Sequence, residues 1–154
     1  METLGVDFDG VIRRFPKFAE WFANFISHDD LLIRARLYWL RNLLCNVCFN
    51  YAPIILDGLM IDSINQWDGR IVIITGRETA KKFDRAFAAV KGKVDFDVMY
   101  GRDTKESEEA YKYRIIKKEN VSVYIEDRDL VIRYLRKRGV DAISVKEVRE
   151  CYRR

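Results

Sequence analysis

Two aspartates separated by one aromatic residue follow an apolar run near the start of the chain, in the stretch VDFDGVI at residues 6–12. Side chains alternate along a strand, so Asp7 and Asp9 are predicted to leave the strand tip on the same side, close to each other. Two neighbouring carboxylates disfavour each other's ionisation. The spacing therefore predicts either a cation between them or a proton on one of them.

Further polar residues follow two other predicted strands, which end in ITGRE and in IEDRD. Those expected to gather around the two aspartates are Thr75, Arg77, Glu126, Asp127 and Asp129. Three or more carboxylates are too many for one shared proton, which indicates a hard cation. Magnesium suits the group because it takes oxygen ligands, accepts only a few carboxylates and keeps positions for water and phosphate oxygens.

Strands and helices alternate along most of the chain. The β-branched runs that predict strands lie at 3–8, 70–75, 94–100, 121–126 and 140–145. The helical patterns between the later runs lie at 78–90, 107–119 and 128–138. This alternation predicts a parallel sheet covered on both faces, with ligands bound beyond the carboxyl ends of the strands.

Composition limits the classes of protein. The length of 154 residues allows one compact domain, and the net charge of +4 with a pI of about 9.0 weakly favours anionic partners. Cys45 and Cys48 form a C-x-x-C without the second pair or histidine cluster of a zinc site. The sequence has neither a signal-peptide pattern nor an uninterrupted apolar span, and it predicts a cytoplasmic protein without membrane contact.

The order DFDGV, ITGR, a lysine and EDRD resembles the four motifs of the haloacid dehalogenase-like hydrolase superfamily, most of whose members are phosphatases that form an aspartyl phosphate. Within it, residues 101–145 are most similar to the phosphatase domain of polynucleotide kinase-phosphatases. The resemblance implies an α/β three-layer sandwich with a Rossmann-like five-stranded parallel sheet.

The resemblance also implies a role for each motif residue. Asp7 is expected to be the nucleophile, and Asp9 the general acid that later acts as a base. The residues expected to bind phosphate oxygens are Thr75, Gly76, Arg77 and Lys112. The expected side-chain ligands of Mg²⁺ are Asp7, Asp9, Asp127 and Glu126.

Several of these assignments have alternatives. Asp129 lies close enough to Asp127 to be the metal ligand instead, and Lys105 or Lys117 could replace Lys112, which could itself be an ordinary exposed lysine. Residues 75–78 read as a capping box, T-x-x-E, so Thr75 could simply begin a helix. Asp127 could be the N-cap of the helix that follows it.

The segment between the first two motifs is too long for a simple crossover. Two amphipathic helical patterns occupy it, with apolar stripes formed by Phe18, Trp21, Phe22, Phe25 and Ile26, and by Ile33, Leu37, Leu40, Leu44 and Val47. Pro53 ends the segment, and a helix at 54–67 returns the chain to the core. We predict a single hydrolase domain over 1–154, with its core at 1–12 and 54–154 and a small helical cap inserted at 13–53.

The sequence therefore predicts a magnesium-dependent phosphatase acting on a nucleic acid 3′-phosphate or a nucleotide. A phosphatase of small metabolites is the alternative within the same superfamily. Two other classes remain: a non-catalytic module that binds a phosphorylated ligand, and a phosphoacceptor signalling domain. Both make less use of a second aspartate beside the nucleophile.

Overall fold

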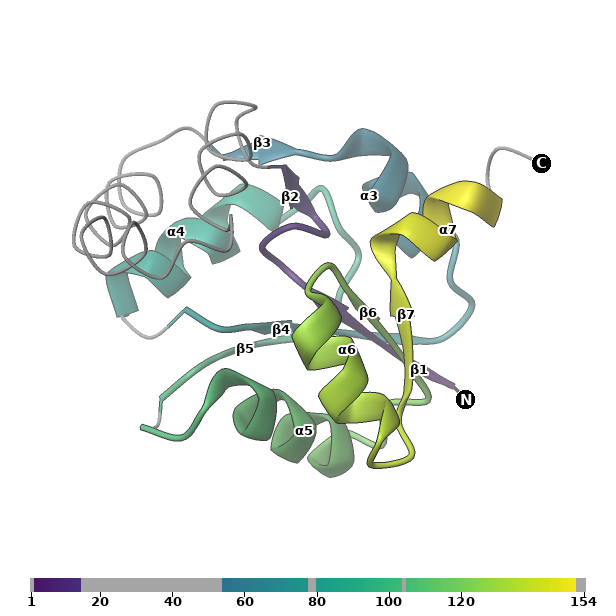
Figure 1. The fold of residues 1–154 in the computed structure, drawn as a ribbon. Helices are drawn as coiled ribbons and strands as arrows, with labels where there is room; N and C mark the ends of the chain where they lie inside the picture. The colour runs from purple at the N-terminus through teal and green to yellow at the C-terminus, as the bar shows by residue number, and fades with distance from the viewer. Residues whose placement is uncertain (1, 15–53, 78–79, 104, 152–154) are drawn as a thin grey trace, which may run out of the picture. The chain divides into compact units, whose positions relative to one another are not determined.

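The computed structural model describes residues 2–14, 54–77, 80–103 and 105–151 (Figure 1). Contacts divide the chain into two units, Met1–Arg14 with Leu56–Arg154, and Phe15–Ile55. The first unit contains the five-stranded sheet and its helices. The predicted cap at 13–53 lies, apart from its first two residues, outside the described residues.

The described elements alternate between strand and helix in the later part of the chain. The strands are β1 (Thr3–Asp7), β2 (Arg13–Arg14), β3 (Ile55–Leu56), β4 (Arg70–Thr75), β5 (Val98–Gly101), β6 (Val123–Glu126) and β7 (Asp141–Ser144). The helices are α3 (Gly58–Asn65), α4 (Ala80–Val90), α5 (Glu108–Lys118), α6 (Asp129–Arg136) and α7 (Val145–Cys151).

Five strands form one parallel sheet, as the sequence predicts, and the structure gives their order as β5-β4-β1-β6-β7. Strand β1 lies at its centre, where Val6 is in register with Ile73 of β4 and Ile125 of β6. Every residue of β1 is buried, because helices cover both faces of the sheet. The carboxyl ends of β1, β4 and β6 therefore meet at one edge of the sheet.

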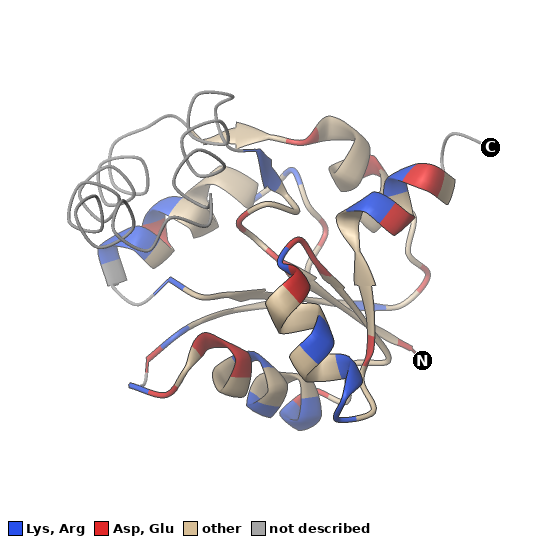
Figure 2. Ribbon diagram, viewed as in Figure 1, with Lys and Arg blue, Asp and Glu red and all other residues tan. Residues whose placement is uncertain are grey.

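Helices α5 and α6 lie on one side of the sheet, and α3, α4 and α7 lie on the other (Figure 1). Apolar side chains of α5 and α6 pack on Val72, Ile74 and Tyr124 to form one core. Helix α5 begins at Ser107, whose hydroxyl accepts a hydrogen bond from the Ala110 N–H. Acidic residues begin α5 and basic residues end it, which complements the helix dipole (Figure 2).

Several parts of the fold differ from the sequence prediction. The helix predicted at 54–67 begins only at Gly58, after β3, because the Asp57 side chain caps it by accepting a hydrogen bond from the Met60 N–H. The strand predicted at 94–100 begins only at Val98, because the Asp97 carboxylate accepts a hydrogen bond from the Ile71 N–H and ends the preceding turn there. Helix α7 was not predicted. Ser144 and Glu147 begin it as a reciprocal capping box, in which each side chain accepts a hydrogen bond from the backbone N–H of the other.

The short two-stranded sheet of β2 and β3 also has no counterpart in the prediction, since two-residue strands leave no periodic signal. Within the described ranges, every helix is too short or too polar to cross a bilayer.

Candidate active site

Three carboxyl groups gather where β1 and β6 end side by side. Asp7 is the last residue of β1, Glu126 is the last of β6, and Asp127 follows directly. Oxygen atoms of all three lie within 4.8 Å of one another, close enough to share one cation. We call Asp7, Glu126 and Asp127 the acidic cluster.

The ammonium group of Lys112 reaches this cluster from the second turn of α5. Its Nζ lies 3.1 Å from Asp7 Oδ1, 2.7 Å from Glu126 Oε2 and 2.8 Å from Glu108 Oε1. The side chain is 0% exposed. Burial alone would lower the pKa of Lys112, but the surrounding negative charges, led by Asp7, raise it well above its usual value. Lys112 is therefore a permanent cation inside the site.

The charged form of Asp7, unlike that of Lys112, is disfavoured by its surroundings. Burial raises the pKa of its carboxyl well above the usual value, Lys112 opposes this shift, and the charges of Glu126, Asp127 and Asp9 add to it. The ionised form that a nucleophile requires is thus disfavoured by the protein alone. A divalent cation beside Asp7 would favour it, and the three oxygen donors have the chemistry that such an ion takes.

Glu126 is held in place by the backbone that follows it. Its Oε1 accepts hydrogen bonds from the N–H groups of Asp127 and Arg128, at 3.2 and 3.3 Å, while its Oε2 contacts Lys112. The helix α6 has Arg128 as its N-cap and no side-chain cap, so Asp127 does not cap it. Glu126 therefore orients the turn that presents Asp127 to the cluster.

The carboxyl of Asp127 lies against the backbone of Gly10, although the residue as a whole is exposed. A Cβ at Gly10 would be 1.9 Å from Asp127 Oδ2, and Gly10 has a φ of +87°. The glycine of DFDG is thus required twice, by the turn and by the carboxylate packed on it. Burial raises the pKa of Asp127 to about 7, and its hydrogen bond with Glu126 and the charge of Glu126 add to the shift.

Gly10→Ala is expected to displace the Asp127 carboxyl and to weaken divalent-cation binding by at least about tenfold, measured by calorimetric titration with Mg²⁺. Gly92→Ala is the matched control, because Gly92 also has a positive φ, of +75°, but nothing lies within 4 Å of its Cβ position. Both variants carry backbone strain of about 1 kcal/mol. Equal loss of cation binding in both would contradict a specific role for the Gly10–Asp127 contact.

Asp9 lies apart from the acidic cluster and is paired with arginines. Arg77 Nε lies 3.0 Å from its Oδ2 and Arg77 Nη2 lies 2.9 Å from its Oδ1, so the guanidinium and the carboxylate form a bidentate ion pair. Arg13 Nη1 adds a third contact at 3.3 Å. The chain turns after Asp7, so Asp7 and Asp9 do not continue one strand as the sequence spacing predicted. Arg77, predicted to bind phosphate, contacts Asp9 in the structure.

Thr75 ends β4, the other neighbour of β1, and Gly76 follows it. Thr75 Oγ1 is buried and has no hydrogen-bond partner among the described residues, so it can take an oxygen ligand. The helix that its predicted capping box would begin includes residue 78, which lies outside the described part. A Cβ at Gly76 would be 2.8 Å from Cδ of Glu108, so the glycine lets Glu108 reach Lys112.

The structure also separates the alternatives left open by the sequence. Lys105 and Lys117 are exposed, whereas Lys112 is buried at Asp7. Asp129 is exposed in the first turn of α6 and does not join the acidic cluster.

Two residues at the site were missed by sequence reasoning. Glu108 bridges Lys112 and Arg128, and its i,i+4 spacing from Lys112 was the available signal. Arg13, which is buried against Asp9, follows the DFDG motif without any pattern that distinguishes it from the neighbouring Arg14.

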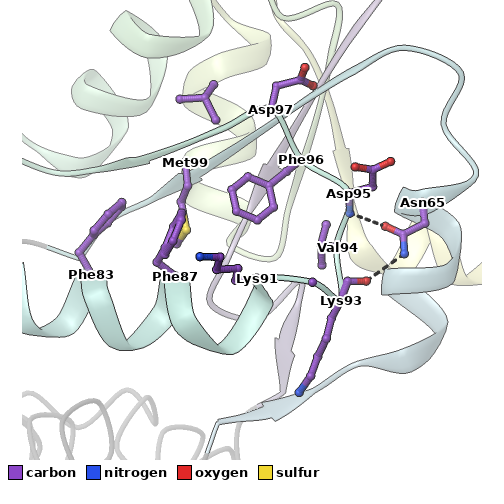
Figure 3. Close-up of a pocket in the computed structure, with 12 residues that line it drawn as sticks. Asn65, Phe83, Phe87, Lys91, Lys93, Val94, Asp95, Phe96, Asp97 and Met99 are labelled. Atoms are coloured by element: carbon purple, nitrogen blue, oxygen red, sulfur yellow. Dashed lines mark hydrogen bonds between the residues drawn. The ribbon is translucent and has the colours of Figure 1, made fainter.

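A cavity of about 780 Å³ lies elsewhere, at the amino end of β5 (Figure 3). Its apolar lining includes Phe83, Phe87 and Phe96, and Lys91 and Lys93 are balanced by Asp95 and Asp97. Because the strands are parallel, this cavity and the acidic cluster belong to opposite edges of the sheet. It contributes no residue to the candidate site.

The fold is shared with solved structures. One chain in the structure of the Pnkp1/Rnl/Hen1 RNA repair complex matches with a TM-score of 0.59 and 16% identity, over 94% of this chain and 42% of that one. A hydrolase from Streptococcus pneumoniae matches with a TM-score of 0.56 and 15% identity, over 99% and 98% of the two chains. A HAD-superfamily hydrolase, subfamily IA, from Geobacter sulfurreducens matches with a TM-score of 0.54 and 14% identity, over 94% and 89%.

This chain therefore has the haloacid dehalogenase-like fold, as its motifs predict. It spans about two fifths of the length of the matching chain in the RNA repair complex. No family model and no curated protein sequence matches it.

Proposed function

We propose that the chain is a magnesium-dependent phosphatase that acts through an aspartyl phosphate on Asp7. One observation supports this above all: a buried carboxylate at a strand end lies between an ammonium group and two further carboxyl groups. A cation site alone does not need Lys112, and an ordinary ion pair does not need three carboxyl groups. Phosphoryl transfer uses both the ammonium group and a cation held by the carboxyl groups, because the substrate brings negative charge into the site.

In the proposed reaction an Asp7 oxygen forms a bond to phosphorus while the bond from phosphorus to the leaving oxygen breaks. Asp9 gives a proton to that oxygen and then removes one from the water that attacks the acyl phosphate. Lys112 and the Thr75 hydroxyl hold phosphate oxygens. A bound Mg²⁺, held by Asp7, Asp127 and Glu126, would offset the charge of the phosphoryl group.

We further propose that the substrate is the 3′-phosphate of a nucleic acid or nucleotide. The similarity of residues 101–145 to polynucleotide phosphatase domains and the shared fold with a chain of an RNA repair complex support this class. The net charge of +4 is also suited to a polyanionic substrate.

The test is phosphate release from 3′-phosphorylated oligonucleotides, 3′-mononucleotides, sugar phosphates and a generic aryl phosphate, each with Mg²⁺ and with chelator. Release that stops with chelator and is fastest from the oligonucleotides is expected. Preference for sugar phosphates would instead favour a small-metabolite phosphatase, a candidate supported by the similar length of the Streptococcus hydrolase. Tight binding of a phosphorylated ligand without turnover would indicate that the chain is a non-catalytic binding module.

Arg77→Lys is expected to lower kcat by about 10- to 100-fold while KM changes little. A lysine keeps the positive charge but cannot reproduce the two-pronged contact that orients Asp9. Steady-state kinetics with the aryl phosphate separates the two parameters. A raised KM with unchanged kcat would mean that Arg77 binds substrate phosphate, as the sequence predicted, and would contradict its role at Asp9.

Mg²⁺ is expected to stabilise the fold more at pH 8 than at pH 5. The pKa of Asp127 is raised to about 7 in the folded chain, so the folded state binds more protons than the unfolded state between pH of about 4 and 7. Without metal, this group makes the fold less stable as pH rises through that interval. A cation requires the deprotonated carboxylate, so its effect grows over the same interval. Thermal unfolding with and without Mg²⁺ measures it, and an unchanged difference at the two pH values would contradict the assignment.

A further inference from the structure

The later turns of α5 and α6 form a surface with excess positive charge. Residues 113–118 contain three basic side chains and residues 130–138 contain four, and neither segment contains an acidic one. The two helices pack against each other. Figure 2 shows basic positions in the later turns of both.

Only some of these charges are neutralised within the protein. Arg114 pairs with Glu106, Lys118 lies near Glu119, and Arg136 pairs with Glu147. Four basic side chains have no carboxylate partner among the described residues, and two half-buried tyrosines lie between them. We define the basic surface as Lys117, Arg133, Lys137 and Arg138 with Tyr113 and Tyr134.

Contacts between cations and rings make this surface continuous. The Arg138 guanidinium lies 3.6 Å from the ring centroid of Tyr134 and 5.9 Å from that of Tyr113. Lys117 Nζ lies 6.0 Å from the Tyr113 ring. Arg138 thus connects α5 to α6, and the tyrosines hold positive charge at the surface without neutralising it.

One face of α6 connects the basic surface to the candidate active site. Leu130, Tyr134 and Arg138 follow one another at intervals of four residues, and the row begins three residues after Asp127. Leu130 is 63% exposed and presents apolar surface at the start of this row. Leu130 and Arg138 are eight positions apart, which at the helical rise of about 1.5 Å per residue is about 12 Å, roughly the length of two to three nucleotides of a single strand.

Basic residues at helix ends also stabilise the helix dipole, by about 0.3–1 kcal/mol each. That effect explains a basic residue in the last turn of each helix. It does not explain an exposed leucine in the first turn of α6 or two tyrosines among the cations. Apolar and aromatic contacts interleaved with positive charge are typical of surfaces that bind single-stranded nucleic acid.

We propose that the basic surface binds the backbone of a single-stranded nucleic acid whose phosphorylated end lies at Asp7. This rests on the proposed function and deepens it, since it makes a polynucleotide rather than a mononucleotide the preferred substrate. Nucleotides adjacent to the reacting end follow α6 past Leu130 and Tyr134 to Arg138.

The test compares the double variant R133A/K137A with the control K91A/K93A, which removes the same charge from exposed lysines that follow α4, on the other face of the sheet. Binding of a single-stranded oligonucleotide of about ten nucleotides with a 3′-hydroxyl end is measured by fluorescence anisotropy at several salt concentrations. We expect R133A/K137A to lose about tenfold in affinity and to reduce the salt slope by about 1.4, as for two lost phosphate contacts. Phosphate release from a 3′-mononucleotide is expected to stay unchanged in both variants.

The proposed role of the basic surface is disproved if R133A/K137A binds the oligonucleotide as tightly as the unmodified protein does. It is also disproved if K91A/K93A loses as much affinity as R133A/K137A. Displacement of the oligonucleotide by polyglutamate at equal charge concentration would likewise overturn it, since only general attraction of anions would remain. The binding assay needs no turnover. If R133A/K137A weakens oligonucleotide binding but no substrate releases phosphate, the proposed binding surface is supported and the proposed phosphatase activity is rejected.

Discussion

Asp7→Asn is expected to reduce phosphate release by a factor of at least about 10³ on every substrate that the unmodified protein hydrolyses. An amide has nearly the size of the carboxylate but cannot attack phosphorus to form an acyl phosphate. The measurement is the turnover rate on the aryl phosphate at saturating Mg²⁺. Robust turnover by this variant would contradict the proposed nucleophile.

The Asp7→Asn variant is expected to remain folded. Burial raises the pKa of Asp7, so ionisation of this carboxyl opposes folding, and a neutral amide removes that effect. Lys112 keeps Glu108 and Glu126 as partners. Asp68→Asn, at an exposed position, is the control for an ordinary loss of charge. A large fall in Tm for Asp7→Asn alone would mean that its loss of activity reflects unfolding.

Lys112→Met is expected to destabilise the fold by about 3–5 kcal/mol, since it removes the cation from between buried carboxyl groups. For a domain of this size the Tm falls by about 10 °C or more. Because carboxyl groups take up protons in acid, the fall is expected to be larger at pH 8 than at pH 5. Thermal unfolding monitored by circular dichroism measures it.

Lys118→Met is the control on the same helix. Its side chain is exposed, so its removal is expected to change stability by less than about 0.5 kcal/mol. Similar Tm values for the two variants would contradict the view that Lys112 neutralises the acidic cluster.

Much of the fold could be predicted from the sequence because the central strands are buried on both faces. The runs around β1, β4 and β6 are continuously apolar and end in polar residues, and these strands lie where the sequence placed them. Parallel pairing then brings Asp7 next to Glu126 without further information. Lys112 was preferred over Lys105 and Lys117 only because its helix resembles that of the family, and its contact with Asp7 is known from the structure alone.

The arrangement around Asp9 could not be predicted in this way. Strand alternation applies only while the strand continues, and β1 ends at Asp7, before the turn that contains Gly10 with its positive φ. The carboxylate then faces Arg13, which begins β2, and Arg77, which follows β4 by two residues. Side-chain partners across a turn depend on its backbone geometry, which residue spacing does not encode.

The most direct test of the central claim is to trap the phosphoryl group on the protein. Rapid quenching during turnover, borohydride reduction and peptide mass spectrometry would convert a phosphorylated aspartate to homoserine at its position. Conversion at Asp7, dependent on Mg²⁺ and absent from Asp7→Asn, is the expected result. Turnover without any modified aspartate, or modification at Asp9 or Asp127 instead, would contradict the proposed site.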